Sequence, residues 1–171
     1  MRVLTPLAAF AALAFAQSAA AATVTVAPVA FSSEFQTALT DDLGPREGVY
    51  LQERVEIAVA RALERAGAQI GPGGDITVET SIIDADPNRP TLEQTAARPG
   101  LDSIRSFSIG GAELHAVIRD SSGQTIAEVT HRYYSPSLSY VFQPTGQWAD
   151  AQRAISGFAA KVAAAYRESG R

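Results

Sequence analysis

The chain has 171 residues, contains no cysteine and carries a formal net charge of −4 at pH 7. This size suits one domain with a substantial core. The lack of cysteine excludes disulfides, thiol catalysis, thiolate metal sites and a lipidated N-terminal cysteine. A mildly acidic chain without a basic stripe also argues against a nucleic-acid partner.

The N-terminal segment has the pattern of a secretory signal peptide. A single arginine precedes the mostly apolar run Val3–Ala16, and Ala20–Ala22 is a small-residue cleavage site. The run is shorter than the ~18 to 20 apolar residues of a membrane-spanning helix, so an uncleaved N-terminal anchor is the less favoured alternative. We therefore expect residues 1–22 to be a signal peptide and residues 23–171 to be one domain. After cleavage near Ala22–Thr23 the protein would be periplasmic or secreted, without a membrane span.

Strand and helix patterns alternate through the first half of this domain. Thr23–Phe31 predicts a first strand, which lies at an edge or is bulged because Pro28 cannot donate to a ladder. Tyr50–Ala66 has an apolar stripe at helical spacing, and Gly67 suits the position after a helix. Asp75–Ile83 predicts a second strand, which a right-handed crossover would place parallel to the first.

A long loop follows the second strand. Asp84–Ser106 contains three prolines and a glycine, which rule out one continuous element. Loops of this length inside a compact domain often carry function. The alternative is a surface excursion that only closes the fold.

A long β-hairpin is predicted for Phe107–Tyr134, and the rest of the domain would pack around it. Asp120–Gly123 is a turn signal between two alternating apolar runs. Gly110–Gly111 interrupts the alternation and predicts a β-bulge.

The register of this hairpin decides which polar side chains share a face. If Asp120 pairs with Gln124, then Glu113 lies opposite His131 and His115 lies diagonally from it. Side chains of these types can bind Zn²⁺, so a metal site at Glu113, His115 and His131 is one hypothesis. A change of register by one residue would separate them. The simpler interpretation makes both histidines polar members of a partly exposed sheet face.

The C-terminal part predicts a short strand or extended arm at Leu138–Phe142 and a second amphipathic helix at Trp148–Tyr166. Aromatic residues are dense before this helix and could line a groove or fill the core. The expected fold class is α+β: a single domain with a mixed sheet of about four strands, in the order β-α-β-β-β-α. Two amphipathic helices would pack on one face of that sheet.

No motif assigns catalysis. The nucleophile motif G-x-S-x-G is absent, although a Ser-His-Asp triad is defined by geometry and not by sequence order. Asp84, Asp86 and Asp102 lack the spacing of a calcium loop and are better explained as turn formers. We therefore expect no cofactor and lean against an enzyme.

The chain resembles a class of small exported bacterial α+β domains, most of them of unknown function. The resemblance lies in the helix ending RALERAG, the run PNRPTLEQ…RPGLDSIRSFSIGGAEL and the hairpin AVIRDSSGQTIAEV. This hairpin is similar to the strand, D-x-x-G, strand pattern of envelope lipoprotein-like domains. The chain departs from the lipoprotein members because it lacks the lipidated cysteine. The resemblance implies a periplasmic accessory or binding role and carries over no catalytic residues.

The resulting functional prediction is a non-enzymatic binding or accessory protein of the cell envelope, with an envelope protein as its partner. The alternatives are a metal-binding protein or metal-dependent hydrolase and a purely structural envelope component. The sequence does not identify a small-molecule ligand. The predicted contact residues come from the long loop and the aromatic stretch: Arg89, Arg98, Arg105, Tyr133, Tyr134, Tyr140 and Trp148.

Overall fold

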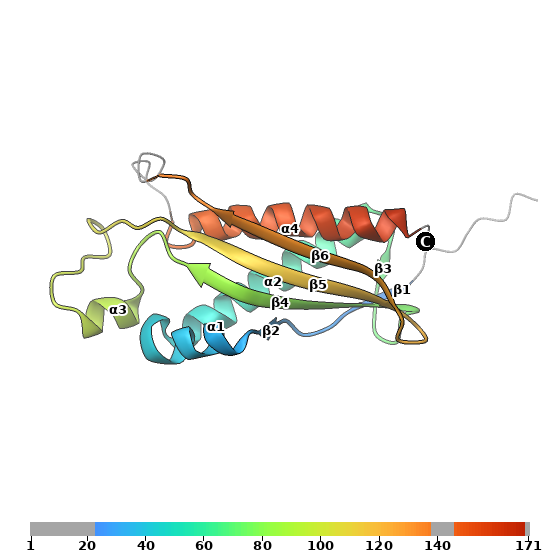
Figure 1. The fold of residues 1–171 in the computed structure, drawn as a ribbon, viewed down its shortest axis with the longest axis horizontal. Helices are drawn as coiled ribbons and strands as arrows, with labels where there is room; N and C mark the ends of the chain where they lie inside the picture. Colours follow the sequence, from blue (N-terminus) through green and yellow to red (C-terminus); the bar gives the residue numbers. More distant parts are fainter. Residues whose placement is uncertain (1–22, 138–145, 170–171) are drawn as a thin grey trace, which may run out of the picture.

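The computed structural model describes residues 23–137 and 146–169. They form an α+β fold in which two long helices cover one face of a mixed sheet (Figure 1). In chain order the elements are β1 (Thr23–Val26), β2 (Ala30–Phe31), α1 (Ser33–Ala38), the π-helix η1 (Leu39–Leu43), α2 (Pro45–Arg65), β3 (Gln69–Ile70), β4 (Ile76–Asp86), α3 (Leu92–Ala97), β5 (Gly111–Asp120), β6 (Thr125–Tyr134) and α4 (Ala149–Glu168).

The sheet has six strands in the described residues, where about four were predicted. Its order is β3-β1-β4-β5-β6, and β2 also pairs with β4. The difference arises because the first predicted strand divides into β1 and β2 on either side of Pro28, and because β3 adds a two-residue edge. The predicted parallel orientation of the first two strands is confirmed, and β1 pairs directly with β4, with Val24 opposite Ile76.

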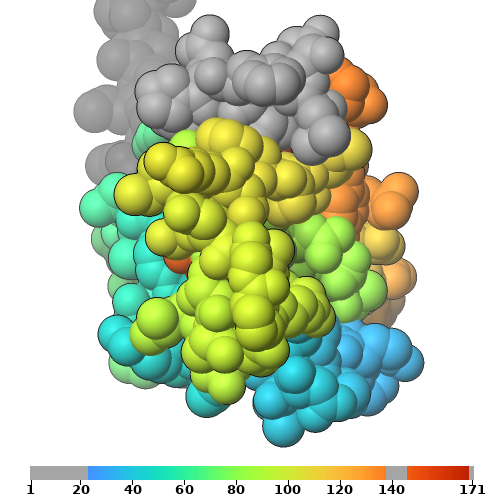
Figure 2. All heavy atoms as spheres, turned by 90° about the vertical axis from the view of Figure 1, so that its left-hand side faces the viewer, coloured from blue at the N-terminus to red at the C-terminus, as the bar shows by residue number. Residues whose placement is uncertain are grey.

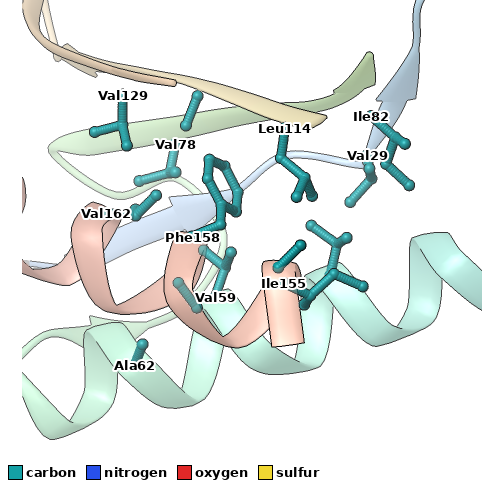
Figure 3. Close-up of a cluster of buried hydrophobic side chains, with 14 of the residues drawn as sticks. Val29, Val59, Ala62, Val78, Ile82, Leu114, Val129, Ile155, Phe158 and Val162 are labelled. Carbon is teal, nitrogen blue, oxygen red and sulfur yellow. The ribbon is translucent and has the colours of Figure 1, made fainter. Parts of the chain in front are cut away.

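The core lies between the helices and the sheet (Figure 3). Phe158 and Val162 of α4 point towards the sheet (Figure 3). Leu114 of β5 lies beside Phe158, Val78 and Val129 lie near Val162, and Val59 of α2 belongs to the same cluster. Buried residues recur at every second position in the strands and at every third or fourth position in the helices. These spacings place the buried side chains on one face of each element, where they form the core. The predicted packing of two amphipathic helices on one face is therefore confirmed.

The helix α2 starts five residues before its predicted start. Pro45 occupies its first turn, where a backbone N–H would have no acceptor within the helix, so the proline loses no hydrogen bond. Gly44 precedes it with a φ of 96°, and Gly67, with a φ of 97°, follows it as predicted.

The second face of the sheet is polar and carries no described helix. Cross-strand pairs join Arg119 to Glu79 at 3.0 Å, His115 to Glu128 at 2.7 Å and Arg132 to Glu113 at 3.2 Å. Exposed ion pairs of this kind contribute only ~0 to 1 kcal/mol each to the stability of the fold. This face is therefore a solvated surface and not part of the packed core. We call it the open face, and it includes Glu79, Ser81, Glu113, His115, Val117, Arg119, Glu128, Thr130 and Arg132.

The hairpin turn forms as predicted, but the predicted register along β5 and β6 is wrong. The N–H of Asp120 donates to the carbonyl of Gln124, and Gly123 has a φ of 82°. A bulge then inserts Ile126, because Arg119 pairs with Thr125 whereas Ile118 pairs with Ala127. One extra residue turns the remainder of β6 over relative to the prediction.

Candidate binding surface

The long loop lies at one end of the sheet, where β4 ends and β5 begins. Residues 87–110 occupy the middle of this end, beside the start of α2 (Figure 2). We use the term loop end for residues 87–110 together with the first turns of α2 and α4. The predicted loop Asp84–Ser106 is displaced in the structure, because β4 continues to Asp86 and β5 begins only at Gly111, and the helix α3 forms inside it.

Asn88 fixes the entry of the loop to the start of α4. Its side-chain amide donates to the Asp150 carboxylate and its side-chain oxygen accepts from the Asp150 backbone N–H at 2.9 Å. The Asn88 backbone donates to the Gln147 carbonyl and accepts from Ser108. Asn88 and Asp150 are both buried, and hydrogen bonds within the protein satisfy their polar atoms, since the second Asp150 oxygen pairs with Arg153 at 2.7 Å. An acidic residue in the first turn of α4 also suits the helix dipole.

The contacts of Asn88 also explain why a glycine is present at position 110. A Cβ at this position would lie 2.5 Å from the side-chain oxygen of Asn88, which its two bonds to Asp150 hold in place. The glycine pair that was predicted to form a β-bulge therefore has another role. It allows close approach of the backbone to Asn88 just before β5 begins at Gly111.

The helix α3 is tied to η1 by polar contacts. Thr91 and Gln94 form a reciprocal capping box at its start. The Gln94 side chain donates to Asp42 at 2.6 Å, and Arg98 forms an ion pair with the other oxygen of the same carboxylate. The loop is therefore braced against the segment that precedes α2.

The second half of the loop is held by Arg89 and Asp102. The guanidinium of Arg89 stacks 4.3 Å from the centre of the Phe107 ring and donates to the carbonyls of Ser103 and Ile104. Asp102 accepts from the backbone N–H groups of Arg105 and Ile104, and these bonds lower the pKa of its carboxyl. The loop therefore has a defined internal structure.

Large apolar side chains are exposed on this braced loop. Ile104 is 75% exposed and Leu92 is 71% exposed, while Phe107 and Ile109 are 41% and 40% exposed. Of the seven large hydrophobic residues that are exposed in the described chain, these four lie in the loop. A gathering of exposed apolar side chains on one element is typical of an interaction surface, whereas scattered ones need no explanation.

An apolar pocket of about 670 Å³ adjoins Leu92, one of these four residues. Tyr50 and Trp148 line it together with Leu92, which connects the pocket to the exposed loop residues. The Trp148 indole N–H donates to Glu47 at 2.6 Å, and Gln152 donates to the Tyr50 hydroxyl at 2.6 Å, so both rings are held in position. The full lining is Leu43, Gly44, Pro45, Arg46, Glu47, Tyr50, Leu92, Glu93, Gly146, Gln147, Trp148 and Gln152.

A second pocket of about 370 Å³ lies within the loop itself and is lined in part by Asp86 and Phe107. Burial, followed by the nearby charge of Asp84, raises the pKa of the Asp86 carboxyl. At the same corner of the sheet, Tyr134 donates its hydroxyl to Asp84. Burial and then this hydrogen bond raise the pKa of Tyr134, so its hydroxyl stays protonated.

The predicted contact residues do not all lie on one surface. Arg89, Arg98 and Arg105 lie at the loop end, where Arg89 and Arg98 are engaged in the bonds that shape the loop. Trp148 lies just before α4 and lines the pocket, but most of its side chain is buried. Tyr133 is half-buried against the core, Tyr134 lies at the end of β6, and Tyr140 lies outside the described residues, as does the predicted strand Leu138–Phe142. Sequence reasoning missed four apolar residues and two pocket residues: Leu92, Ile104, Phe107, Ile109, Glu47 and Tyr50.

The three predicted metal ligands do not meet. Glu113 and His115 lie on the open face, whereas His131 opposes Leu114 and lies on the helix-covered face. There a Cβ on Gly157 would come within 2.7 Å of the His131 ring nitrogen, so the missing side chain makes room for the histidine. Burial, and then Lys161, lower the pKa of His131 and favour its neutral form. The prediction of one shared face is therefore wrong, and no group of three suitable ligands exists in the described residues.

Comparison with known proteins supplies the family and the fold. A family model described as "Protein of unknown function (DUF3313)" matches residues 5–162, so the chain belongs to this family. No curated protein matches. Within residues 23–137 and 146–169, no helix is both long enough and apolar enough to cross a membrane.

Two solved structures of bacterial proteins share the fold at low sequence identity, and a third matches more weakly. A point variant of PelC from Paraburkholderia phytofirmans, solved as a dodecamer, matches with a TM-score of 0.50 and 14% identity, over 85% of this chain and 86% of that one. Protein XCC0632 from Xanthomonas campestris also has a TM-score of 0.50 and 14% identity, over 88% and 86% of the two chains. Lipoprotein GNA1162 from Neisseria meningitidis matches with a TM-score of 0.40 and 12% identity, over 68% and 85%.

Proposed function

We propose that this member of the DUF3313 family is an exported, non-enzymatic binding protein of the cell envelope, which holds a protein partner at its loop end. The observation that carries the proposal is the set of exposed apolar side chains Leu92, Ile104, Phe107 and Ile109 on a loop that is braced from within. When a partner covers exposed apolar surface, the free energy of the complex falls by roughly 25 cal/mol per Å² of that surface.

The bracing of the loop supports a binding role. A flexible loop loses conformational entropy when it is ordered at an interface, whereas a preorganised loop loses much less. The Asn88–Asp150 anchor, the capping box of α3 and the Arg89–Phe107 stack preorganise this one. The pocket beside Leu92 adds an aromatic site, of the kind in which an apolar anchor residue from a partner is buried.

The proposed location rests on the N-terminal sequence, which has a positive residue, an apolar run and a small-residue cleavage site. The fold is compatible with assembly into oligomers, since PelC, which shares it, was solved as a dodecamer. The partner that the proposal requires is a protein with apolar side chains that can enter the pocket and cover the loop.

A cross-linked purification from the producing cell tests this function. The tagged full-length chain should fractionate with the envelope and should bring down one protein in stoichiometric amount. A chain that stays in the cytoplasmic fraction, or that recovers nothing above a tag-only control, would contradict the proposal.

A further inference from the structure

The strand β6 forms a long edge of the sheet. In the described part of the chain this ten-residue strand pairs with no strand other than β5, whereas β3 at the opposite edge has only two residues. Alternate backbone N–H and C=O groups of an edge strand point away from the sheet and can pair with another strand. The strand contains no proline and no lysine, two residue types that commonly block such pairing.

The open-face charges of β6 are arranged to match a second copy of the same strand. Glu128 and Arg132 lie two positions to either side of Thr130. Their side chains are 66% and 68% exposed. If two β6 strands pair antiparallel about a twofold axis at Thr130, each Glu128 lies opposite Arg132 of the other copy. We therefore propose that two copies of this chain associate through their β6 edges and form one continuous sheet.

Other symmetric registers are less favourable. Directly opposed residues must share a face, so the centre of pairing can move only in steps of one residue along β6. Centring the pair on Glu128 or on Arg132 places like charges opposite each other, which is destabilising. If the twofold axis lies at Val129 or His131, neither Glu128 nor Arg132 faces an oppositely charged residue of the other copy. The register at Thr130 alone joins opposite charges, and it does so twice.

The helix layer fits the same arrangement. The helix α4 packs on β5 and β6 and runs along them (Figure 1). Because strands lie about 4.8 Å apart, the two α4 helices would be separated by about 10 Å, near the usual spacing of packed helices. Gly157 lies against His131 of β6, so this flank of α4 lies beside the new edge. The missing side chain at Gly157 leaves room there for the second helix, while Lys161, whose charge also acts on His131, follows one turn further along α4.

Charge reversal tests the register directly by sedimentation velocity of the purified full-length protein. The wild-type chain should sediment as a dimer, and Arg132→Glu or Glu128→Arg should each weaken dimerisation at least tenfold by placing like charges opposite each other. The double variant Glu128→Arg/Arg132→Glu should restore the dimer. It does not restore the intrachain pairs of these residues with His115 and Glu113, so restoration reports the contact between copies.

Arg119→Glu provides the matched control, because Arg119 lies on the same open face but on the inner strand β5, paired with Glu79. It should leave the dimer intact. A monomeric wild-type protein at about 100 µM, a concentration far above typical dissociation constants of specific complexes, would overturn the proposal. An oligomer that the single reversals leave unchanged, or a double variant that stays monomeric, would also overturn it. Changes at the loop end should not affect this dimer, so the two proposals fail separately.

Discussion

Replacing Leu92 and Ile104 together by serine should lower the affinity for the envelope partner by at least about 100-fold, because burying such side chains contributes ~1.5 to 3 kcal/mol each and every 1.4 kcal/mol is tenfold in affinity. Both side chains are more than two-thirds exposed and neither belongs to the core. The melting temperature should therefore stay close to that of the wild type. Co-purification from the envelope and thermal unfolding measure the two quantities on the same preparations.

The matched control replaces Ile57 and Ile70 by serine. These residues are also exposed and apolar, but they lie in α2 and β3, outside the loop end. Partner recovery should be unchanged in this variant. If both double variants lose the partner equally, general surface hydrophobicity and not the loop end would be responsible. If neither loses it, the assignment of the surface is wrong.

Replacing Asn88 by alanine should lower the free energy of unfolding by about 2 to 4 kcal/mol, because it removes two partners from the buried Asp150. For a domain of this size the melting temperature should fall by roughly 10 °C. The loop should also lose its attachment to α4 and become open to proteolysis between β4 and β5. Thermal unfolding and limited proteolysis check the two effects.

Ser103→Ala is the control for the Asn88 change, since this residue is exposed in the same loop. Its backbone carbonyl, which accepts from Arg89, is retained in the variant. The control should unfold like the wild type. An Asn88→Ala protein with unchanged stability and an uncleaved loop would show that the anchor does not hold the loop in place.

Those parts of the fold that depend on regular patterns could be predicted from the sequence. The apolar stripes of α2 and α4 repeat at helical spacing, and the alternation in β4 and β5 marks a sheet with one buried face. The turn at Asp120–Gly123 was recognisable from its residue types. Each of these patterns depends only on residues that are close in the sequence, so it can be recognised without knowledge of the tertiary structure.

The hairpin register could not be predicted, because the bulge at Ile126 has no clear sequence signal. The bulged residue is an ordinary apolar one, and nothing in its neighbours requires an extra residue there. Since a strand has a period of two, this single insertion moved His131 to the helix side and removed the predicted metal site.

The sequence places a candidate contact surface in this loop and assigns it to arginine and tyrosine side chains, whereas the structure exposes apolar side chains there. Arginines are prominent in the sequence of this loop, yet Arg89 and Arg98 are occupied with holding it together. The exposed apolar residues could have been noted from the sequence, because Leu92 and Ile104 lie in polar surroundings without a periodic pattern. Their exposure depends on how the loop packs against η1 and α4, and only the tertiary structure shows that.

The most direct test of the binding surface is site-specific photo-cross-linking in the intact producing cell. A photoreactive residue would replace Ser103 at the loop end in one version and Glu56 of α2 in another, both of which are exposed. The proposal predicts one discrete adduct with an envelope protein from position 103 and none from position 56. An adduct from position 56 alone, or the same adduct from both positions, would contradict the claim that the loop end holds the partner.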